Sequence, residues 1–405
     1  MKVCKKPFIW YLVAILVFSL GFTWYSRWSQ IQEVSAVNIL RRVIPGGPVF
    51  WMAHEGDYVA GVGTAENDYD ETALYLYDTK GTWADLSDDT YSIIDQVEGG
   101  ISHITFQGNY ITWLDTTGGF SSNPMVLKSY NLMTASTSII SDQIADYVYG
   151  RDGDKVVYQY VVPNGRDIAL YDLSTQQTTI ICNASGFQRN PRIKNNVIVW
   201  EDSRNPQTGI DIYMYNLNSQ TETLVAGDVG DYFVLPITNG TYVVYHEMKP
   251  DYTPEYIKKY HIPSQTTSII ASASNNERIL NHSVHFNQSS SLNQHIVWVL
   301  HDRQDNTQSK LYLHHLDTST NTIIDQGSSV GYVTAFQING QQVVYSTQDM
   351  QSVFGWDIQQ QQSYIIRNTG KTYSYYLHPI NNTLLMCSYD TGDSDEWDIS
   401  YASLP

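Results

Sequence analysis

Acidic, basic and histidine side chains follow a series of short apolar segments in this chain of 405 residues. In VIVWEDSRN (197–205), Glu201, Asp202 and Arg204 come directly after the apolar run. Carboxylates and histidines held together can exchange protons with a substrate, and two carboxylates at a suitable separation can cleave a glycosidic bond. The same position after other apolar segments holds seven further residues: Asp115, His246, Glu247, His301, Asp302, Arg303 and Asp390. These ten residues are candidates for binding, and none is assigned as catalytic.

A structural role competes with this interpretation. Asp in a turn commonly accepts hydrogen bonds from backbone N–H groups of the same turn. Because similar turns recur along the chain, repetition favours the structural role for any single residue. Asp202 and Arg204 can also pair within one hairpin. The functional interpretation requires the loops to bring the candidates together around one opening.

Local fingerprints of cofactor chemistry are missing. The chain contains no G-x-x-x-x-G-K-[ST] or G-x-G-x-x-G stretch and no C-x-x-C pair, which argues against a nucleotide site and a cysteine metal site. The acid-rich stretches ENDYDE (66–71) and DTGDSDEWD (390–398) offer the oxygen ligands that calcium prefers. Neither has the residue order of an EF-hand loop, and solvated turns are the alternative. We expect no cofactor. Calcium is the metal that the acid-rich stretches leave open.

Composition indicates a globular all-β protein. Hydrophobic residues make up 42% and charged residues 16%, and the chain has 31 Tyr and 10 Trp, which favour pleated, half-buried surfaces. The net charge is −18, although residues 1–30 carry +4, so the remainder carries −22. A body this acidic repels other polyanions, and we expect no nucleic-acid partner.

The amino terminus has the pattern of a targeting segment. Lysines precede an uncharged apolar run from Phe8 to about Tyr25, which is near the lower length limit for crossing a bilayer. We predict an uncleaved signal anchor in residues 1–30, a single-pass protein of the cell membrane, and a body outside the cytoplasm. The alternative is a cleaved signal peptide and a secreted or periplasmic protein.

Apolar segments that end in a large residue form a repeat. Clear copies end at Trp113, Tyr158, Trp200, Tyr245, Trp298 and Tyr345, and weaker copies end at Ala60 and Met386. Successive copies lie 41–53 residues apart, which is typical of propeller blades made of four short antiparallel strands. Further strands follow in phase, for example IYMYNLN (212–218). The candidates are then expected in the loop between the second and third strands of their blades.

Eight units can be counted, so we predict an eight-bladed β-propeller in residues 46–405, with seven blades as the alternative. The last unit ends after three strands. A propeller can close its ring by pairing a strand from the other end of the chain, which leaves no free sheet edge. SAVNILRRVI (35–44), within the linker of residues 31–45, is the expected donor.

The stretch WEDSRN followed by DIYMYNL and TETLV resembles the TolB-type and PD40-type (WD40-like) propeller repeats of extracytoplasmic proteins. The resemblance extends over nearly the whole body and implies a ring of sheets that binds partners, without a catalytic motif. We therefore predict a membrane-anchored, non-catalytic binding or scaffold module for a protein, a peptide or a cell-surface polymer. The alternative is a propeller-type glycosidase or polysaccharide lyase that uses loop acids and histidines at the channel mouth.

Overall fold

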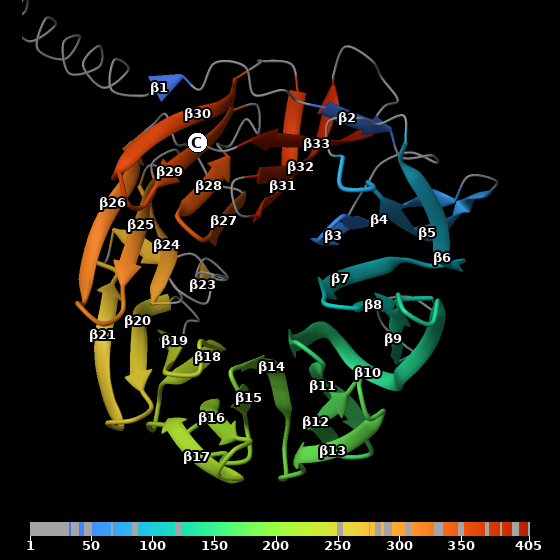
Figure 1. Ribbon diagram of the computed structural model, residues 1–405. Helices are drawn as coiled ribbons and strands as arrows, with labels where there is room; N and C mark the ends of the chain where they lie inside the picture. Colours follow the sequence, from blue (N-terminus) through green and yellow to red (C-terminus); the bar gives the residue numbers. More distant parts are fainter. Residues whose placement is uncertain are drawn as a thin grey trace, which may run out of the picture.

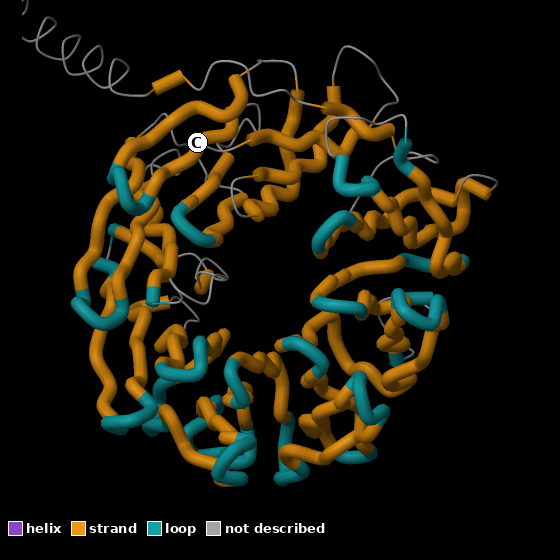
Figure 2. The backbone as a smooth tube through the Cα atoms, viewed as in Figure 1, coloured by secondary structure: helices purple, strands orange, loops and turns teal. Residues whose placement is uncertain are grey.

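The computed structural model describes residues 32–33, 40–43, 51–65, 68–82, 88–117, 124–248, 254–274, 276–279, 285–286, 294–304, 309–327, 335–346, 352–368, 372–380, 383–390 and 397–403. The elements in these segments are β-strands joined by turns (Figure 2). None of the described segments forms a helix that could span a membrane. The predicted signal anchor lies outside the described residues.

Eight units of four strands form a ring (Figure 1). The first four blades contain, from the innermost to the outermost strand, β3 (Trp51–Glu55), β4 (Tyr58–Ala65), β5 (Asp68–Asp78) and β6 (Thr90–Val97); β7 (Ile101–Gln107), β8 (Tyr110–Asp115), β9 (Met125–Asn131) and the first half of β10 (Ser136–Asp152); the second half of β10, β11 (Lys155–Val162), β12 (Gly165–Asp172) and β13 (Gln177–Cys182); and β14 (Gln188–Lys194), β15 (Val197–Asp202), β16 (Asp211–Asn216) and β17 (Thr221–Ala226).

The other four blades contain β18 (Tyr232–Thr238), β19 (Tyr242–Met248), β20 (Pro254–His261) and β21 (Thr266–Ser272); β22 (Glu277–Ile279) with β23 (His285–Phe286), β24 (His295–Asp302), β25 (Ser309–His315) and β26 (Thr320–Gly327); β27 (Ala335–Asn339), β28 (Gln342–Ser346), β29 (Ser352–Asp357) and β30 (Gln362–Asn368); and β31 (Thr372–Ile380), β32 (Thr383–Asp390), β33 (Trp397–Ser403) and β2 (Leu40–Val43). The predicted all-β propeller with eight blades is confirmed, and the seven-blade alternative is wrong.

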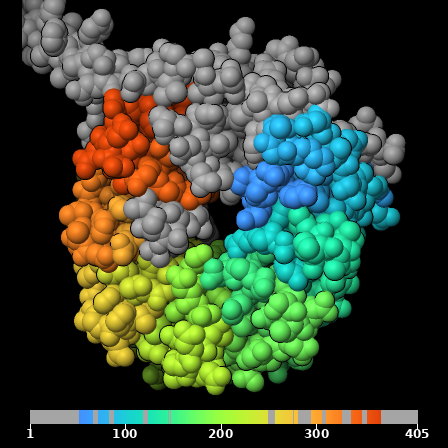
Figure 3. Space-filling model, in the orientation of Figure 1, coloured from blue at the N-terminus to red at the C-terminus, as the bar shows by residue number. Residues whose placement is uncertain are grey.

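The ring is continuous around its centre. The innermost strands β3, β7, β10, β14, β18, β23, β27 and β31 contact one another in this order, and β31 contacts β3. β2 pairs with β33 in antiparallel orientation, so a strand from the start of the chain completes the last blade. β1 (Gln32–Glu33) runs parallel to β30 at the outer edge of the seventh blade. In the space-filling view the centre of the ring is hollowed beside the first blade (Figure 3).

The repeated aromatic residue belongs to a row of side chains across the blade. In the fourth blade, Trp200 of the second strand pairs with Tyr213 of the third, and their rings stack with centroids 6.2 Å apart. Tyr213 in turn pairs with Leu224 of the outermost strand. Trp200 is fully buried and packs against Val157 of the preceding blade. Large apolar side chains therefore join neighbouring blades. Truncating a buried aromatic one to Ala lowers the free energy of unfolding by about 3–5 kcal/mol.

Candidate functional site

A β-bulge interrupts the innermost strand of several blades close to its first residues. The pairing register shifts between Ser102 and Thr105, Ile144 and Tyr149, Arg189 and Arg192, Val234 and Ile237, and Ser374 and Leu377. Three of these bulges contain a residue with positive φ, namely His103 (51°), Asn190 (54°) and Leu235 (57°). A bulge bends its strand and redirects side chains, and bulges are frequent beside active sites.

The bulges lie at one end of the ring. The first residues of an innermost strand pair with the last residues of the second strand, as Gln188 does with Asp202 and Ile101 with Asp115. The bulges and the ends of the second strands therefore surround the same mouth of the central opening. The ten candidates from the sequence lie near the ends of these second strands or directly after them.

Glu201 connects two bulges. Its Oε1 accepts hydrogen bonds from the side-chain amide of Asn190 (2.7 Å) and from the backbone N–H of Leu235 in the next blade (2.8 Å). Its Oε2 accepts from Nε of Arg189 at 2.7 Å. Gln159, at the same place in the preceding blade, accepts from the backbone N–H of Asn190 at 3.1 Å. These bonds offset the cost of burying Glu201, which is 1% exposed, and give it a structural role.

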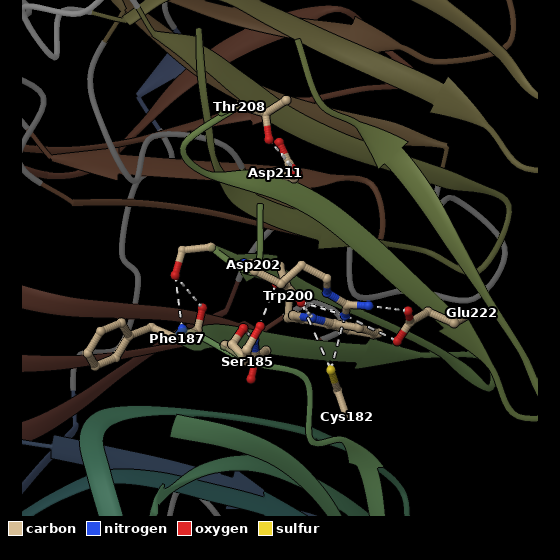
Figure 4. A network of polar contacts seen from close by, with 11 residues as sticks. Cys182, Ser185, Phe187, Trp200, Asp202, Thr208, Asp211 and Glu222 are labelled. Atoms are coloured by element: carbon tan, nitrogen blue, oxygen red, sulfur yellow. Dashed lines mark hydrogen bonds and ion pairs between the residues drawn. The ribbon is translucent and has the colours of Figure 1, made fainter. Parts of the chain in front are cut away.

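Asp202 is fully buried in a polar network of the fourth blade that also includes Cys182 of the third (Figure 4). It accepts hydrogen bonds from Nε1 of Trp200 (2.9 Å) and from the backbone N–H (2.9 Å) and Nη2 (2.6 Å) of Arg204. Arg204 also pairs with Glu222 at 2.6 Å and lies over the ring of Tyr213. Burial acts to lower the pKa of Arg204, but the hydrogen bonds to Asp202 and Glu222 outweigh it and raise that pKa.

Asp115 and Glu247 are likewise bound within their own blades. Asp115 accepts from the backbone N–H of Thr117 at 2.9 Å and pairs with Lys128 at 2.8 Å. Burial acts to raise the pKa of Asp115, but Lys128 and Thr117 outweigh it and hold that pKa below its usual value. Glu247 pairs with Lys258 on the neighbouring strand.

The remaining candidates are spread over the sixth and eighth blades, apart from the buried His246 of the fifth. Asp302 accepts from the backbone N–H of Gln304 at 2.8 Å, and Arg303 donates to the backbone oxygen of Glu277 at 2.8 Å. His301 is 1% exposed, and burial together with the charge of Arg278 lowers its pKa to about 4. Asp390 ends β32, and its side chain lies outside the described part.

The expected loop position of the candidates needs correction. Asp115, Asp202 and Asp302 are the last residues of β8, β15 and β24, and Glu201, His246, Glu247 and His301 also lie within strands. The pairing continues past the aromatic residue, because Glu201 pairs with Ile212 and Asp202 with Asp211. Arg204 and Arg303 alone follow the ends of their strands.

A second group of polar residues at the mouth was missed. We call His103, Asp146, Arg166, Arg189 and Arg192 the mouth cluster. These residues come from the innermost strands of the second, third and fourth blades, except Arg166, which is the second residue of β12. Asp146 pairs with Arg166 at 3.4 Å. Burial and the positive charge of Arg192 lower the pKa of His103 to about 4, against the opposing effect of Asp146.

Close backbone packing brings Arg166 to this place. The turn before it approaches the next blade, and a Cβ on Gly165 would lie 2.1 Å from the backbone oxygen of Gly186. Only glycine permits this approach. Arg166 then forms a parallel bridge with Phe187, just before β14. The available signal in the sequence was three arginines between residues 166 and 192 of an otherwise acidic body.

Two further motifs give no site in the described residues. GSSVG (327–331) has the G-x-S-x-G spacing of a nucleophile elbow, which requires a strand-to-helix turn. Gly327 ends the outermost strand β26, and residues 328–331 lie outside the described part. Residues 66–67 and 391–396 of the two acid-rich stretches also lie outside it. Cys182 is a buried free thiol whose pKa is raised to about 11 by burial.

No protein-family model matches the chain, and no curated protein matches it. Among solved structures, an oligogalacturonate lyase in complex with manganese has a TM-score of 0.53 and 10% identity over 89% of this chain and 99% of that chain. A prolyl endopeptidase has a TM-score of 0.56 and 8% identity over 86% of this chain and 55% of that chain. TolB from Acinetobacter baumannii has 16% identity over 67% of this chain and 64% of that chain, with a TM-score of 0.40 that carries no argument.

These comparisons contradict the prediction of a non-catalytic binding or scaffold module. The lyase and the endopeptidase are enzymes, so the alternative of a propeller enzyme fits the similar structures better. The prediction of a binding module rests on the repeat architecture, the targeting segment and the resemblance to TolB-type repeats, which carries no catalytic motif. A propeller can assemble a site from several blades, and such a site leaves no local motif. The resemblance to TolB-type repeats is confirmed for the propeller fold, and membership of the PD40 family stays a prediction.

The manganese in the lyase structure raises the question of a metal centre here. Within the described segments, no three His, Cys, Asp or Glu residues are grouped so that they could hold a metal ion. The mouth cluster itself offers one histidine and one carboxylate, and that carboxylate is paired with Arg166. The described residues do not fit a metal centre.

Proposed function

We propose that this chain is a propeller-type enzyme that cleaves a polysaccharide, as a lyase or a glycosidase, at the bulge-lined mouth. The observation that carries the proposal is the extent of the likeness to the oligogalacturonate lyase, which covers 99% of that chain. A propeller thus accounts for nearly all of that enzyme. The likeness to the prolyl endopeptidase covers 55% of that chain, so the present chain spans about half of its length and peptidase activity has less support.

The mouth cluster supplies groups suited to such chemistry. With a pKa of about 4, His103 is neutral at neutral pH and can accept a proton. Arg192, whose charge acts on His103, can stabilise negative charge that develops on a substrate. The two nearby acids are less suited to act as a hydrolytic pair, because Asp146 is paired with Arg166 and Glu201 accepts three hydrogen bonds. These contacts favour elimination over hydrolysis by two carboxylates.

The targeting segment gives the proposal a location. A signal anchor in residues 1–30 would hold the propeller outside the cytoplasm, next to polymers of the cell envelope. Protease treatment of intact cells tests this arrangement. Digestion of the propeller is expected, and complete protection until the membrane is broken would contradict it.

Activity is tested by incubating the purified full-length protein with charged and neutral polysaccharides and weighing the products by mass spectrometry. Elimination leaves a double bond, so its product lacks the water that hydrolysis adds. We expect cleavage that is lost in His103→Ala and retained in Lys194→Gln, which alters the far end of β14. Absence of cleavage across the panel would contradict the proposal.

A further inference from the structure

The pairing of β1 shows from which side the chain enters the ring. β1 pairs with β30 in parallel orientation at the rim of the seventh blade (Figure 1). Gln32 lies opposite Tyr364 and Glu33 opposite Ile365. Because the pairing is parallel, β1 runs in the same direction as β30, and the chain enters β1 from the side on which β30 begins.

β30 begins at the end of its blade that lies opposite the mouth. β28 is the second strand of this blade, and its last residue, Ser346, pairs with the first residue of the innermost strand, so Ser346 lies at the mouth. β29 pairs antiparallel with both β28 and β30. β30 therefore runs in the same direction as β28, and its first residue, Gln362, lies at the opposite end. We call this end of the seventh blade, with its turns 339–341 and 358–361, the base.

A short stretch of chain separates β1 from the predicted signal anchor. The apolar run of the anchor ends at about Tyr25, and Gln32 follows Tyr25 by seven residues. Seven extended residues span at most about 25 Å, and the headgroup layer on one side of a bilayer takes about 5–8 Å of this length. With residues 1–30 as the anchor, the link therefore holds the seventh blade close to the membrane surface, and it reaches the blade from the base.

The two turns of the base expose no charged side chain. They consist of Asn, Gly, Gln and Ile residues. Asp357, which precedes the second turn, is buried and accepts a hydrogen bond from the backbone N–H of Gln360 at 2.7 Å. In the first blade, by contrast, the turn after the innermost strand exposes Glu55 and Asp57. Anionic headgroups repel the acidic body, and an uncharged base avoids this repulsion.

We propose that the base of the seventh blade lies against the bilayer that holds the anchor, so that the mouth opens away from the membrane. The partner of this surface is the lipid headgroup layer of the same membrane. The direction of β1 and the lack of exposed charge in the two turns carry the assignment independently. The inference rests on the signal anchor of the proposed function and does not depend on the cleavage reaction.

This orientation limits which molecules reach the mouth. A polymer that extends away from the membrane has direct access to it. A glycolipid whose sugar stays within the headgroup layer lies on the other side of the ring, because a strand of six residues such as β16 already separates the two ends of a blade by about 20 Å.

Energy transfer to labelled headgroups tests the orientation. The full-length protein is placed in lipid nanodiscs whose headgroups carry an acceptor dye, and a donor dye is attached through a clickable amino acid at one exposed position at a time. Gln359 lies at the base of the seventh blade, Ser219 at the same end of the fourth blade, and Gln207 at the mouth end of the fourth. Since β16 holds the last two positions about 20 Å apart, we expect transfer about twofold or more higher from Ser219 than from Gln207. Transfer from Gln359 should be the highest.

Equal transfer from Ser219 and Gln207, or higher transfer from Gln207, would overturn the proposal. A variant with 20 Gly and Ser residues inserted between Gln30 and Ile31 tests the link, because such an insert adds a flexible reach of about 25 Å. The difference between Ser219 and Gln207 should shrink in this variant, and an unchanged difference would contradict the role of the short link. Absence of transfer from all three positions would overturn the anchor and this inference but not the cleavage reaction. The expected order of transfer without any cleavage would contradict the proposed activity alone.

Discussion

The turn after β15 and the mouth cluster are both rich in charge, but they differ in how that charge is balanced. In the turn, Asp202 is bound by Trp200 and Arg204, and Arg204 is bound by Glu222 as well. In the mouth cluster, Arg192 has no carboxylate partner within the described residues. Charges satisfied within one blade stabilise that blade, whereas a charge without a carboxylate partner on a braced bulge is available to a ligand. We therefore place the proposed chemistry in the mouth cluster rather than in the more conspicuous turn.

The largest expected effect is a loss of protein stability when the network of the turn is broken. Asp202→Asn removes a buried charge that Arg204 and Trp200 both contact, and Arg204 then loses one of its two carboxylate partners. We expect a loss of about 3–5 kcal/mol in the free energy of unfolding. Urea unfolding followed by circular dichroism measures it. A loss below about 1 kcal/mol would mean that the turn is not held by this network.

The next effect concerns the hydrogen bonds by which Glu201 connects two bulges. Glu201→Ala leaves the N–H of Leu235 and the amide of Asn190 without their acceptor, and we expect a loss of about 2–3 kcal/mol. Glu201→Gln keeps an acceptor, as Gln159 does in the preceding blade, so its loss should be about 1 kcal/mol. Equal losses in urea unfolding for the two variants would contradict the role of the acceptor oxygen.

The pH dependence of cleavage reports on His103. Because the pKa of His103 is lowered to about 4, the imidazole is neutral above that pH and protonated below it. We expect kcat/KM to fall about tenfold per pH unit below pH 4 and to be level from there towards neutral pH. Arg192→Met removes a charge that lowers this pKa, so the fall should begin at higher pH. An unshifted profile, with folding checked by circular dichroism at each pH, would show that the two residues are not coupled.

The smallest effect is expected from Lys194→Gln. Lys194 pairs with Asp152 at 2.9 Å, and both side chains are partly exposed. Such pairs contribute about 0.5 kcal/mol, so urea unfolding should change little. A loss above about 2 kcal/mol would make this variant unsuitable as the control in the cleavage assay and would point to a structural use of Lys194.

The sequence predicted the fold well because every blade repeats the same physical pattern. An aromatic residue recurs in the second strand of six blades, as Trp200 does in the fourth, and its recurrence reveals the period. The donor strand could also be anticipated, since β2 lies within residues 35–44 and pairs with β33. The end of the second strand was misplaced by a few residues, because Glu201 and Asp202 are polar yet continue the pairing.

The mouth cluster could not be predicted in the same way. His103, Asp146 and Arg192 belong to three blades and are more than 40 residues apart from one to the next. They meet because bulges bend three innermost strands at the same end of the ring, and no local pattern marks a bulge at His103. Glu201 stands out in the sequence through its neighbours Asp202 and Arg204, although its hydrogen-bond partners lie on other strands.

The most direct measurement compares kcat/KM, on the polysaccharide that the full-length protein cleaves, for Arg192→Met and Arg204→Met, each corrected for its folded fraction. Both changes remove one arginine from the fourth blade, the first from the bulge and the second from the turn. We predict a fall of about tenfold or more for Arg192→Met and a change within about twofold for Arg204→Met. A fall for Arg204→Met with full activity for Arg192→Met would contradict the distinction between the open charge of the mouth and the satisfied charges of the turn.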